Sequence, residues 1–452
     1  MAEIINPYQA RFVSGRRTND NIILVQEVIR TLKYRRGRTG YVAIKLDLEK
    51  AYDRLEWSFI QETLVFFQLS PNLITLIMNM LSSTRFHILW NGMPLPKVVS
   101  SWGVRQGDTL SPYLFILCLE RLSLKLEEAM RDKLLHPISF RGRVCLSHLF
   151  FADDIFLFTH AKAKDHIKLS HILQQFCAAS RQLVSVTKSR LWFSPNTSWH
   201  YKDQVTGILG VPTMNHIGTY LGTPIFTSQR TTSSYQYLVD KIRMKIKGWQ
   251  TKYLSMAGRA TLIKSVVSTI PIYAMQTTLL PQNISHQLDK MNYNFLWGDT
   301  GQHRSCHTVN WETVTMPKEV GGLGLTSIRH RNLAILMHHD LHLYTNLDTI
   351  WARILKAKYF LHSPMFDDTK KAHGSHIWAT FRHGIKLLRE GMSWIVGDGQ
   401  DIRIWQDSWL PRGTLRSYIE GPLQWLAKDS KVSSLRVNHS WTFESLTFPL
   451  PP

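Results

Sequence analysis

Cysteine is scarce in this sequence. Only four of the 452 residues are cysteines, at positions 118, 145, 177 and 306, and none belongs to a CxxC pair. This spacing offers neither a disulfide framework nor a cysteine-rich zinc site. We therefore expect the protein in a reducing compartment.

The sequence also lacks a long apolar run. No stretch approaches the roughly 18 uncharged residues of a membrane span, and the first residues, MAEIINPYQARF, lack the apolar core of a secretory signal. No targeting signal or transmembrane segment is indicated, the sequence predicts no membrane partner, and it gives no basis for inferring a protein partner. The nucleus and the cytoplasm remain as expected locations.

Acidic residues are few relative to basic ones. The chain has 54 lysines and arginines against 33 aspartates and glutamates, which gives a net charge of +21. Such an excess favours a polyanionic partner, a nucleic acid before a membrane surface, over a merely basic exterior.

Two adjacent carboxylates interrupt the apolar stretch FFADDIFLFTH, residues 150–160. This stretch predicts a β-hairpin with Ala152, Asp153 and Asp154 at its tip. Burying an unpaired carboxylate is costly, so the aspartates must face either water in a turn or a cation. The stretch alone leaves both interpretations open.

Periodicity predicts the neighbouring elements. Residues 40–48, GYVAIKLDL, alternate with period two and should form a strand that ends in a carboxylate, with one face of Val42, Ile44, Leu46 and Leu48 and the other of Tyr41, Ala43, Lys45 and Asp47. A helix capped by Asn19 or Asp20 should precede the strand, with an apolar face of Ile22, Val25, Ile29 and Leu32. A helix capped by Asp53 should follow the strand, since Glu56 stands at capping-box spacing. Residues 111–130 should form a long helix packed in the core, with a serine cap and proline at its first position.

The second half of the chain divides by composition. Residues 235–281 predict basic helices, with Gly258 and Pro271 as breaks. Nine of the fifteen tryptophans and twelve of the twenty histidines lie beyond Pro281, so we place a domain boundary at that proline.

If their strands are neighbours, Asp47 and the Asp153–Asp154 pair converge. Converged carboxylates repel one another unless divalent cations lie between them. Two metal ions about 3.5–4 Å apart would suit an in-line phosphoryl transfer. Between these carboxylates lies GVRQGDTLSP, residues 103–112, whose glycines allow close approach to a ligand and whose Arg105 and Gln106 offer donors to phosphate or base.

In order and spacing, KLDLEKAYD, GVRQGDTLSP and FADD resemble three successive motifs of reverse transcriptases, and more narrowly those of plant non-LTR retrotransposons of the long interspersed element type. QARFVSGRRTNDNI, TYLGTPIF, GWQTKYLSMAGRATLIKSV, PKEVGGLGL and GDGQDIRIWQDSWLP extend the resemblance over nearly the whole chain. It implies an α+β fold with a right-hand polymerase palm, an antiparallel sheet with helices. The implied parts are partial fingers in residues 1–35, the palm with part of the fingers in 36–230, thumb-like basic helices in 231–281 and a mostly helical, Trp- and His-rich region in 282–452.

The resemblance implies an RNA-directed DNA polymerase. It would extend a DNA primer at its 3′ hydroxyl on an RNA template, using deoxynucleoside triphosphates and two Mg²⁺ ions, with Mn²⁺ as a substitute. By similarity, Asp47, Asp153 and Asp154 are the catalytic metal ligands, and Asp153 is shared by both ions.

Further roles are implied in the same way. The Leu48 carbonyl would help hold the metal of the triphosphate, and Tyr52 would be the steric gate against a sugar 2′-hydroxyl. Lys188 would protonate the leaving pyrophosphate. Taken alone, Tyr52 could equally be a core aromatic, Lys188 a surface lysine and Asp53 a helix cap or a metal ligand. The loop residues Arg105, Gln106 and Gly107 would contact nucleotide and template, and the residues assigned to the nucleic acid are Arg16, Gly222, Lys245, Lys247, Arg259 and Lys264.

The sequence departs from the family pattern at both ends. It begins near QARF, without the endonuclease and first fingers motif, and it ends before the zinc-knuckle-like and ribonuclease H segments that often follow. Thr109 replaces a usual proline, and QLVSVTKSR departs from the usual residues before the lysine. We therefore expect a chain truncated at both ends relative to the family. The alternative is a catalytically inactive retroelement remnant that acts at most as a nucleic-acid-binding protein.

Overall fold

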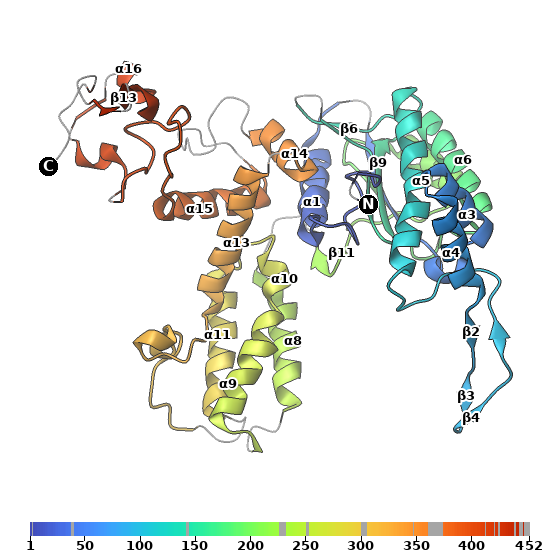
Figure 1. Ribbon diagram of the computed structural model, residues 1–452, viewed down its shortest axis with the longest axis horizontal. Coiled ribbons are helices and arrows are strands. Elements are labelled where there is room, and N and C mark those ends of the chain that lie inside the picture. Colours follow the sequence, from blue (N-terminus) through green and yellow to red (C-terminus); the bar gives the residue numbers. More distant parts are fainter. Residues whose placement is uncertain are drawn as a thin grey trace.

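The computed structural model describes the chain except residues 2, 38–39, 142–143, 226–231, 250–252, 300–304, 347, 360–373, 412, 420, 424, 438–439, 443–445 and 447–452. A central sheet is flanked by helices, a helical bundle extends away from them, and a C-terminal segment lies at the far side of the bundle (Figure 1). No described helix is both long and apolar enough to cross a bilayer.

The central sheet has four antiparallel strands in the order β10–β1–β9–β8. These strands are β1 (Tyr41–Asp47), β8 (His148–Phe151), β9 (Asp154–His160) and β10 (Arg190–Phe193). Alternation sends successive side chains of β1 to opposite faces of the sheet. Both faces are buried, so β1 lies between two separate cores. The predicted strand and hairpin are confirmed.

The first core lies between one face of the sheet and helices from the first half of the chain (Figure 1). It contains the predicted apolar face of β1, which is Val42, Ile44, Leu46 and Leu48. The helices are α2 (Ala51–Arg54), α3 (Trp57–Phe66), α4 (Pro71–Ser82), α5 (Ser111–Arg131), α6 (Ala163–Ser180) and α7 (Trp199–Leu209). The long core helix α5 is confirmed, although Leu110 rather than Ser111 occupies its N-cap position.

The second core lies on the opposite face, under α1 (Thr18–Tyr34), α14 (Ile350–Tyr359) and α15 (His376–Gly391). Helix α1 is buried around most of its circumference because the sheet lies on one side and the two late helices on the other. The predicted caps Asn19 and Asp20 are inside α1, which begins after Arg17. Asp20 instead accepts a hydrogen bond from the Arg17 backbone N–H at 3.4 Å.

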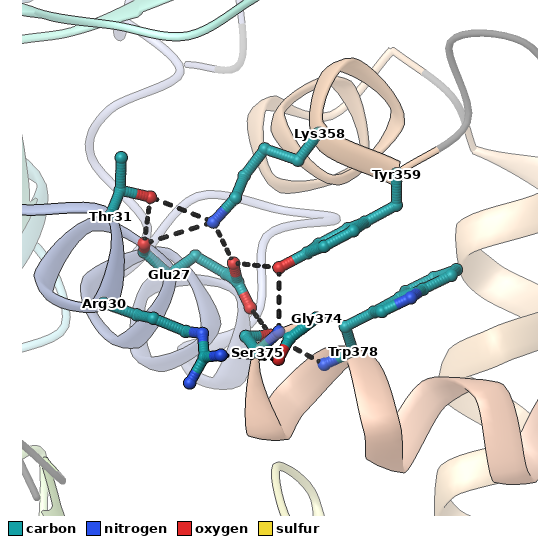
Figure 2. A network of polar contacts seen from close by, with 8 residues as sticks. All are labelled: Glu27, Arg30, Thr31, Lys358, Tyr359, Gly374, Ser375 and Trp378. Atoms are coloured by element: carbon teal, nitrogen blue, oxygen red, sulfur yellow. Dashed lines mark hydrogen bonds and ion pairs between the residues drawn. The ribbon is translucent and has the colours of Figure 1, made fainter. Parts of the chain in front are cut away.

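A buried polar network joins α1 to the late helices (Figure 2). The Glu27 carboxylate, 1% exposed, pairs with Lys358 and accepts hydrogen bonds from the Tyr359 hydroxyl at 3.0 Å and the Ser375 hydroxyl. Lys358 also donates to the Thr31 hydroxyl at 2.9 Å. Ser375 in turn caps α15 by accepting from the Trp378 backbone N–H. One buried charge pair therefore fixes three helices from opposite ends of the sequence.

Five short antiparallel ribbons complete the strand content of the described residues. Two of them form one arm that extends away from α4 (Figure 1). The arm strands are β2 (Arg85–Phe86) with β5 (Val98–Val99) and β3 (Leu89–Trp90) with β4 (Met93–Pro94). The other ribbons are β6 (Ile138–Ser139) with β7 (Cys145–Leu146), β11 (Thr219–Tyr220) with β12 (Thr223–Pro224), and β13 (Arg436–Val437) with β14 (Ser440–Trp441).

The helical bundle contains the predicted basic helices. Its members are α8 (Gln236–Lys247), α9 (Met256–Ser265), α10 (Ile272–Met275), α11 (Gln282–Trp297) and α13 (Ile328–Thr345), with the short α12 (Trp311–Val314) beside α11. Pro271 does precede a new helix, α10. Gly258, however, does not break a helix as predicted, since it lies in the first turn of α9. The helix begins after Ser255, whose side chain accepts a hydrogen bond from the Gly258 backbone N–H at 3.2 Å.

Helices on both sides of Pro281 share one core, which includes Val239, Met275 and Leu288. The boundary predicted at Pro281 therefore does not coincide with a break in packing. Helix dominates as far as Gly391. After it, the described residues hold one short helix, α16 (Trp425–Lys428), two 3₁₀ turns and the last ribbon around a small core centred on Trp405.

Candidate functional site

The three predicted carboxylates lie at one end of the central sheet. Asp154 is the direct partner of Asp47 in the pairing of β1 with β9. Asp153 occupies the two-residue turn between β8 and β9 with Ala152, whose φ of 54° reverses the chain. Opposite residues of an antiparallel pair project to the same face. The strands are thus neighbours as predicted, but the carboxylate directly across from Asp47 is Asp154, while Asp153 is exposed in the turn.

The ionisation of Asp154 depends on its burial and on the charged side chains around it. Burial raises the pKa of Asp154, the charges of Asp153 and Asp47 raise it further, and the Lys45 ammonium opposes them. Mutually repelling oxygen ligands are what a hard divalent cation neutralises, so the residues fit such an ion in donor type and charge. Among the described residues, however, no three histidine, cysteine or acidic side chains stand close enough together to hold a metal ion.

Lys188 lies at the same strand end. Its Nζ is 3.7 Å from Asp47 Oδ1. Backbone pairing places it there, because the Ser185 N–H donates to the Asp47 carbonyl at 2.8 Å and the Asp47 N–H donates to Ser189 Oγ at 3.2 Å. Sequence reasoning found the lysine but missed the buried Ser189, which holds the end of β1 in register. A serine in an irregular segment gave no signal of this role.

Tyr52 lies on the turn of helix that follows β1. Lys50 adopts the left-handed conformation, φ 48°, so α2 begins at Ala51 and encloses Asp53. The predicted cap at Asp53 is therefore wrong, and Glu56 is the N-cap residue of α3. The half-buried Tyr52 ring stacks on Phe115 with centroids 4.9 Å apart. Burial raises the pKa of Tyr52, and the negative charge of Asp153 raises it further.

The loop of residues 103–108 is fixed against α2. The Val104 N–H donates to the Tyr52 carbonyl at 2.8 Å, and Trp57 Nε1 donates to the Gly103 carbonyl at 2.7 Å. Gly103 has a φ of 81°, and a Cβ there would come within 2.6 Å of the Asp53 carbonyl oxygen, so only glycine fits. The side chains of this loop line a pocket of about 620 Å³ next to Tyr52's helix.

Of the predicted loop contacts, Arg105, Gln106 and Gly107 are all exposed. Gln106 Nε2 donates to Asp53 Oδ1 at 3.1 Å, which gives Asp53 a role in positioning the loop. Leu48, by contrast, is buried in the first core through its side chain.

Two arginines of the QARF segment have roles that the sequence did not reveal. The Arg11 guanidinium lies 5.0 Å from the Phe151 ring centroid, and its charge lowers the pKa of Asp154 and of Tyr52. Arg16 donates to the carbonyls of Ile5, Asn6 and Gln9 at 2.6–2.7 Å. Arg16 therefore anchors the N-terminal segment, and its guanidinium is engaged with backbone rather than presented to a nucleic acid.

The other predicted nucleic-acid residues lie beyond the sheet. Gly222 is in the two-residue turn between β11 and β12, and Lys45 Nζ ties this ribbon to β1 by donating to the Thr219 carbonyl at 3.1 Å. Lys245, Lys247 and Lys264 are exposed on the bundle. Arg259 is only partly exposed and lies against Gly298, where no Cβ would fit.

Comparison with known proteins agrees with the motifs. Residues 1–238, more than half of the chain, match the family model described as reverse transcriptase (RNA-dependent DNA polymerase). A ribonuclease H protein of Arabidopsis thaliana is 33% identical over 41% of this chain and 31% of its own length. The 149 kDa protein of transposon TX1 of Xenopus laevis is 25% identical over 79% of this chain and 27% of its own. The chain spans about a third or less of the length of these relatives.

Among solved structures, the telomerase of Candida tropicalis in complex with a fragment of telomeric RNA shares 13% identity, over 84% of this chain and 53% of its own, with a TM-score of 0.35. The family match covers every residue of the carboxylate site, the Tyr52 helix and the 103–108 loop. The family predicted from the three motifs is therefore confirmed, and the chain belongs to the reverse transcriptase family.

Proposed function

We propose that the chain is the RNA-directed DNA polymerase of a non-LTR retroelement, acting in the nucleus or cytoplasm. The observation that carries the proposal is the placement of Asp47 opposite Asp154, with Asp153 in the adjoining turn and Lys188 Nζ 3.7 Å from Asp47. A basic net charge and the exposed lysines of the bundle support nucleic acid as the partner.

The carboxylates are the residues that would hold divalent metal. Asp47 and Asp153 would be the principal ligands and Asp154 a supporting one, with Mg²⁺ as the expected ion, two per site, and Mn²⁺ as a substitute. When bound, such ions activate the primer hydroxyl and stabilise the charge on the leaving pyrophosphate. Burial is the main cause of the raised pKa of Asp154, and the charges of Asp153 and Asp47 add to it, so a cation bound between these carboxylates would relieve their repulsion.

The chain's own residues position the substrates. The Tyr52 ring, held by its stack on Phe115, excludes a 2′-hydroxyl from the sugar site and thereby selects deoxynucleotides. Arg105 and Gln106 offer donors to the triphosphate and template from a loop that shares backbone hydrogen bonds with α2. Lys188 brings an ammonium proton to the strand end where pyrophosphate leaves.

One observation favours a second function. The carboxylates do not gather into a three-ligand cluster among the described residues. A protein of this family that binds primer–template without catalysis would show the same basic surface and the same fold. This alternative is a nucleic-acid-binding retroelement remnant.

Primer extension on an RNA template distinguishes the two functions. The purified chain is given an annealed DNA primer, deoxynucleoside triphosphates and either Mg²⁺ or Mn²⁺, beside Asp153→Asn and the exposed control Asp132→Asn. We expect extension by the unmodified chain and the control, and none by Asp153→Asn, with primer–template binding equal in all three. Binding without extension in either metal would establish the alternative.

A further inference from the structure

The arm formed by residues 85–99 has an apolar tip that none of the described helices or strands covers. Leu89, Trp90 and Met93 are 69%, 68% and 71% exposed. The turn at its end, Asn91–Gly92, has positive φ at both positions, 50° and 80°, as a tight two-residue hairpin requires. The turn fixes Trp90 opposite Met93. Large apolar side chains held in place on a protruding ribbon mark an interaction surface.

The charge around the tip identifies the class of partner. From Thr63 to Gly107 the sequence contains no aspartate or glutamate. The arm itself carries Arg85, His87 and Lys97. An aromatic tip on a basic, carboxylate-free ribbon is complementary to a nucleic acid, whose phosphates attract the flanks and whose bases stack on the ring.

The base of the arm is continuous with the 103–108 loop. Phe86 lies under the Arg105 guanidinium, 5.6 Å from its Cζ to the ring centroid. Phe86, Trp102, Arg105 and Gln106 line the same pocket of about 620 Å³. The root of the arm and the 103–108 loop therefore border the same pocket.

We propose that the arm separates nucleic-acid strands ahead of the polymerase site, with Trp90 stacking on the end of the duplex while the strand paired to the template is displaced. The inference rests on the proposed function for the identity of the template. A base stacked on an aromatic ring gains about as much free energy as one stacking step of a duplex. The Trp90 indole can therefore replace the stacked base that a nucleotide loses when its base pair opens.

The first test measures strand opening without synthesis. A primer–template with a complementary strand annealed ahead of the primer carries 2-aminopurine at the first base pair of the junction. We expect its fluorescence to rise when the unmodified chain or Trp199→Ala binds, and to stay low with Trp90→Ala. Trp199 is the matched control because it is 77% exposed and belongs to α7, outside the arm. No rise with the unmodified chain, or an equal rise with Trp90→Ala, would overturn the proposal.

The second test compares extension on open and blocked templates. On an open template, Trp90→Ala should match the unmodified chain. On the blocked template it should yield about tenfold less full-length product, since the stack at the junction is lost. Failure of every protein on the open template would reject the proposed function, whereas the fluorescence result would still decide the role of the arm.

The alternative partner of the tip is a second copy of the chain, which would make the tip a dimer contact. Sedimentation at several protein concentrations separates the two cases. A dimer that Trp90→Ala dissociates would overturn the strand-separating role, and a concentration-independent monomer supports it.

Discussion

Asp47 faces Asp154 across the pairing of β1 with β9, and Asp153 lies in the turn that precedes Asp154. Burial raises the pKa of Asp154, and the charges of Asp153 and Asp47 raise it further. Because the folded pKa lies above the unfolded one, the group lowers stability as pH rises past its ordinary value.

Removing one of these charges should stabilise the metal-free protein. We predict that Asp154→Asn raises the melting temperature at pH 8 without divalent ions, and that added Mg²⁺ raises it less in the variant than in the unmodified chain, because one ligand is missing. Thermal unfolding with and without Mg²⁺ measures both effects. An unchanged Mg²⁺ response would exclude Asp154 from the metal site.

Tyr52 should control sugar selection. Replacing it with valine removes the ring that stacks on Phe115, and ribonucleotide incorporation relative to deoxynucleotide incorporation should increase about ten- to a hundredfold. Single-nucleotide extension with each triphosphate measures the ratio. Tyr34→Val, at a 62% exposed position on α1, serves as the control. Equal selectivity in all three proteins would make Tyr52 a packing residue only.

The lysines at the end of α8 should contribute to affinity through phosphate contacts. Lys245→Gln with Lys247→Gln should weaken primer–template binding and reduce the slope of log affinity against log salt by about 2, or roughly one per contact. Titrations from low to physiological salt give the slope. A slope identical to that of the unmodified chain would place the nucleic acid elsewhere.

Glu27 should be the most sensitive residue of the joint between α1 and the late helices. Glu27→Ala leaves Lys358, which is only 17% exposed, without its carboxylate, and removing one partner of a buried pair costs up to about 3–5 kcal/mol. Denaturant unfolding measures the loss. Glu62→Ala, at an exposed position on α3, should change stability little. The double change Glu27→Leu with Lys358→Met should recover most of the loss, since neither charge then remains.

Asp340 should make stability depend on pH. It is fully buried on α13, and neither carboxylate oxygen has a hydrogen-bond partner among the described residues. Burial raises its pKa from 3.8 to about 9. The unfolded chain therefore releases a proton that the folded chain keeps, and the free energy of unfolding falls as pH rises between these two values.

Asp340→Asn should remove this contribution. The variant should gain stability over the unmodified chain as pH rises from 5 to 8, by at most about 1.4 kcal/mol per pH unit. Glu120, whose pKa burial raises to about 8, acts in the same direction and is present in both proteins. Urea unfolding at the two pH values measures the difference. A constant difference would mean that Asp340 is ionised in the folded state.

The sequence pattern correctly predicted features that depend only on residues adjacent in the chain. The alternation of β1 gave both of its faces correctly, because strand geometry fixes side-chain direction residue by residue. The Asp53 cap was wrong because the left-handed Lys50 starts a helix three residues earlier, which no spacing of apolar residues reveals. The neighbourhood of Arg11 depends on the β8–β9 turn and on Tyr52, which are distant in sequence.

The burial of α1 could not be predicted for the same reason. Its apolar face was visible, but its other side is covered by helices more than 300 residues later, and the partner of Glu27 is 331 residues away. A glutamate on a helix reads as a solvent-facing residue until that partner is known.

The joint between α1 and the late helices determines when during synthesis the fold can be completed. At about 5–20 residues per second, Lys358 leaves the ribosome roughly 20–70 s after Glu27. Throughout that interval the far side of α1 has no cover, and Glu27, which the late helices will bury, is exposed to water and has no counter-charge. The nascent chain then exposes apolar surface, which makes such an intermediate prone to aggregation. A fragment ending at residue 238, where the family match ends, would remain in that condition permanently, even though it contains the whole carboxylate site.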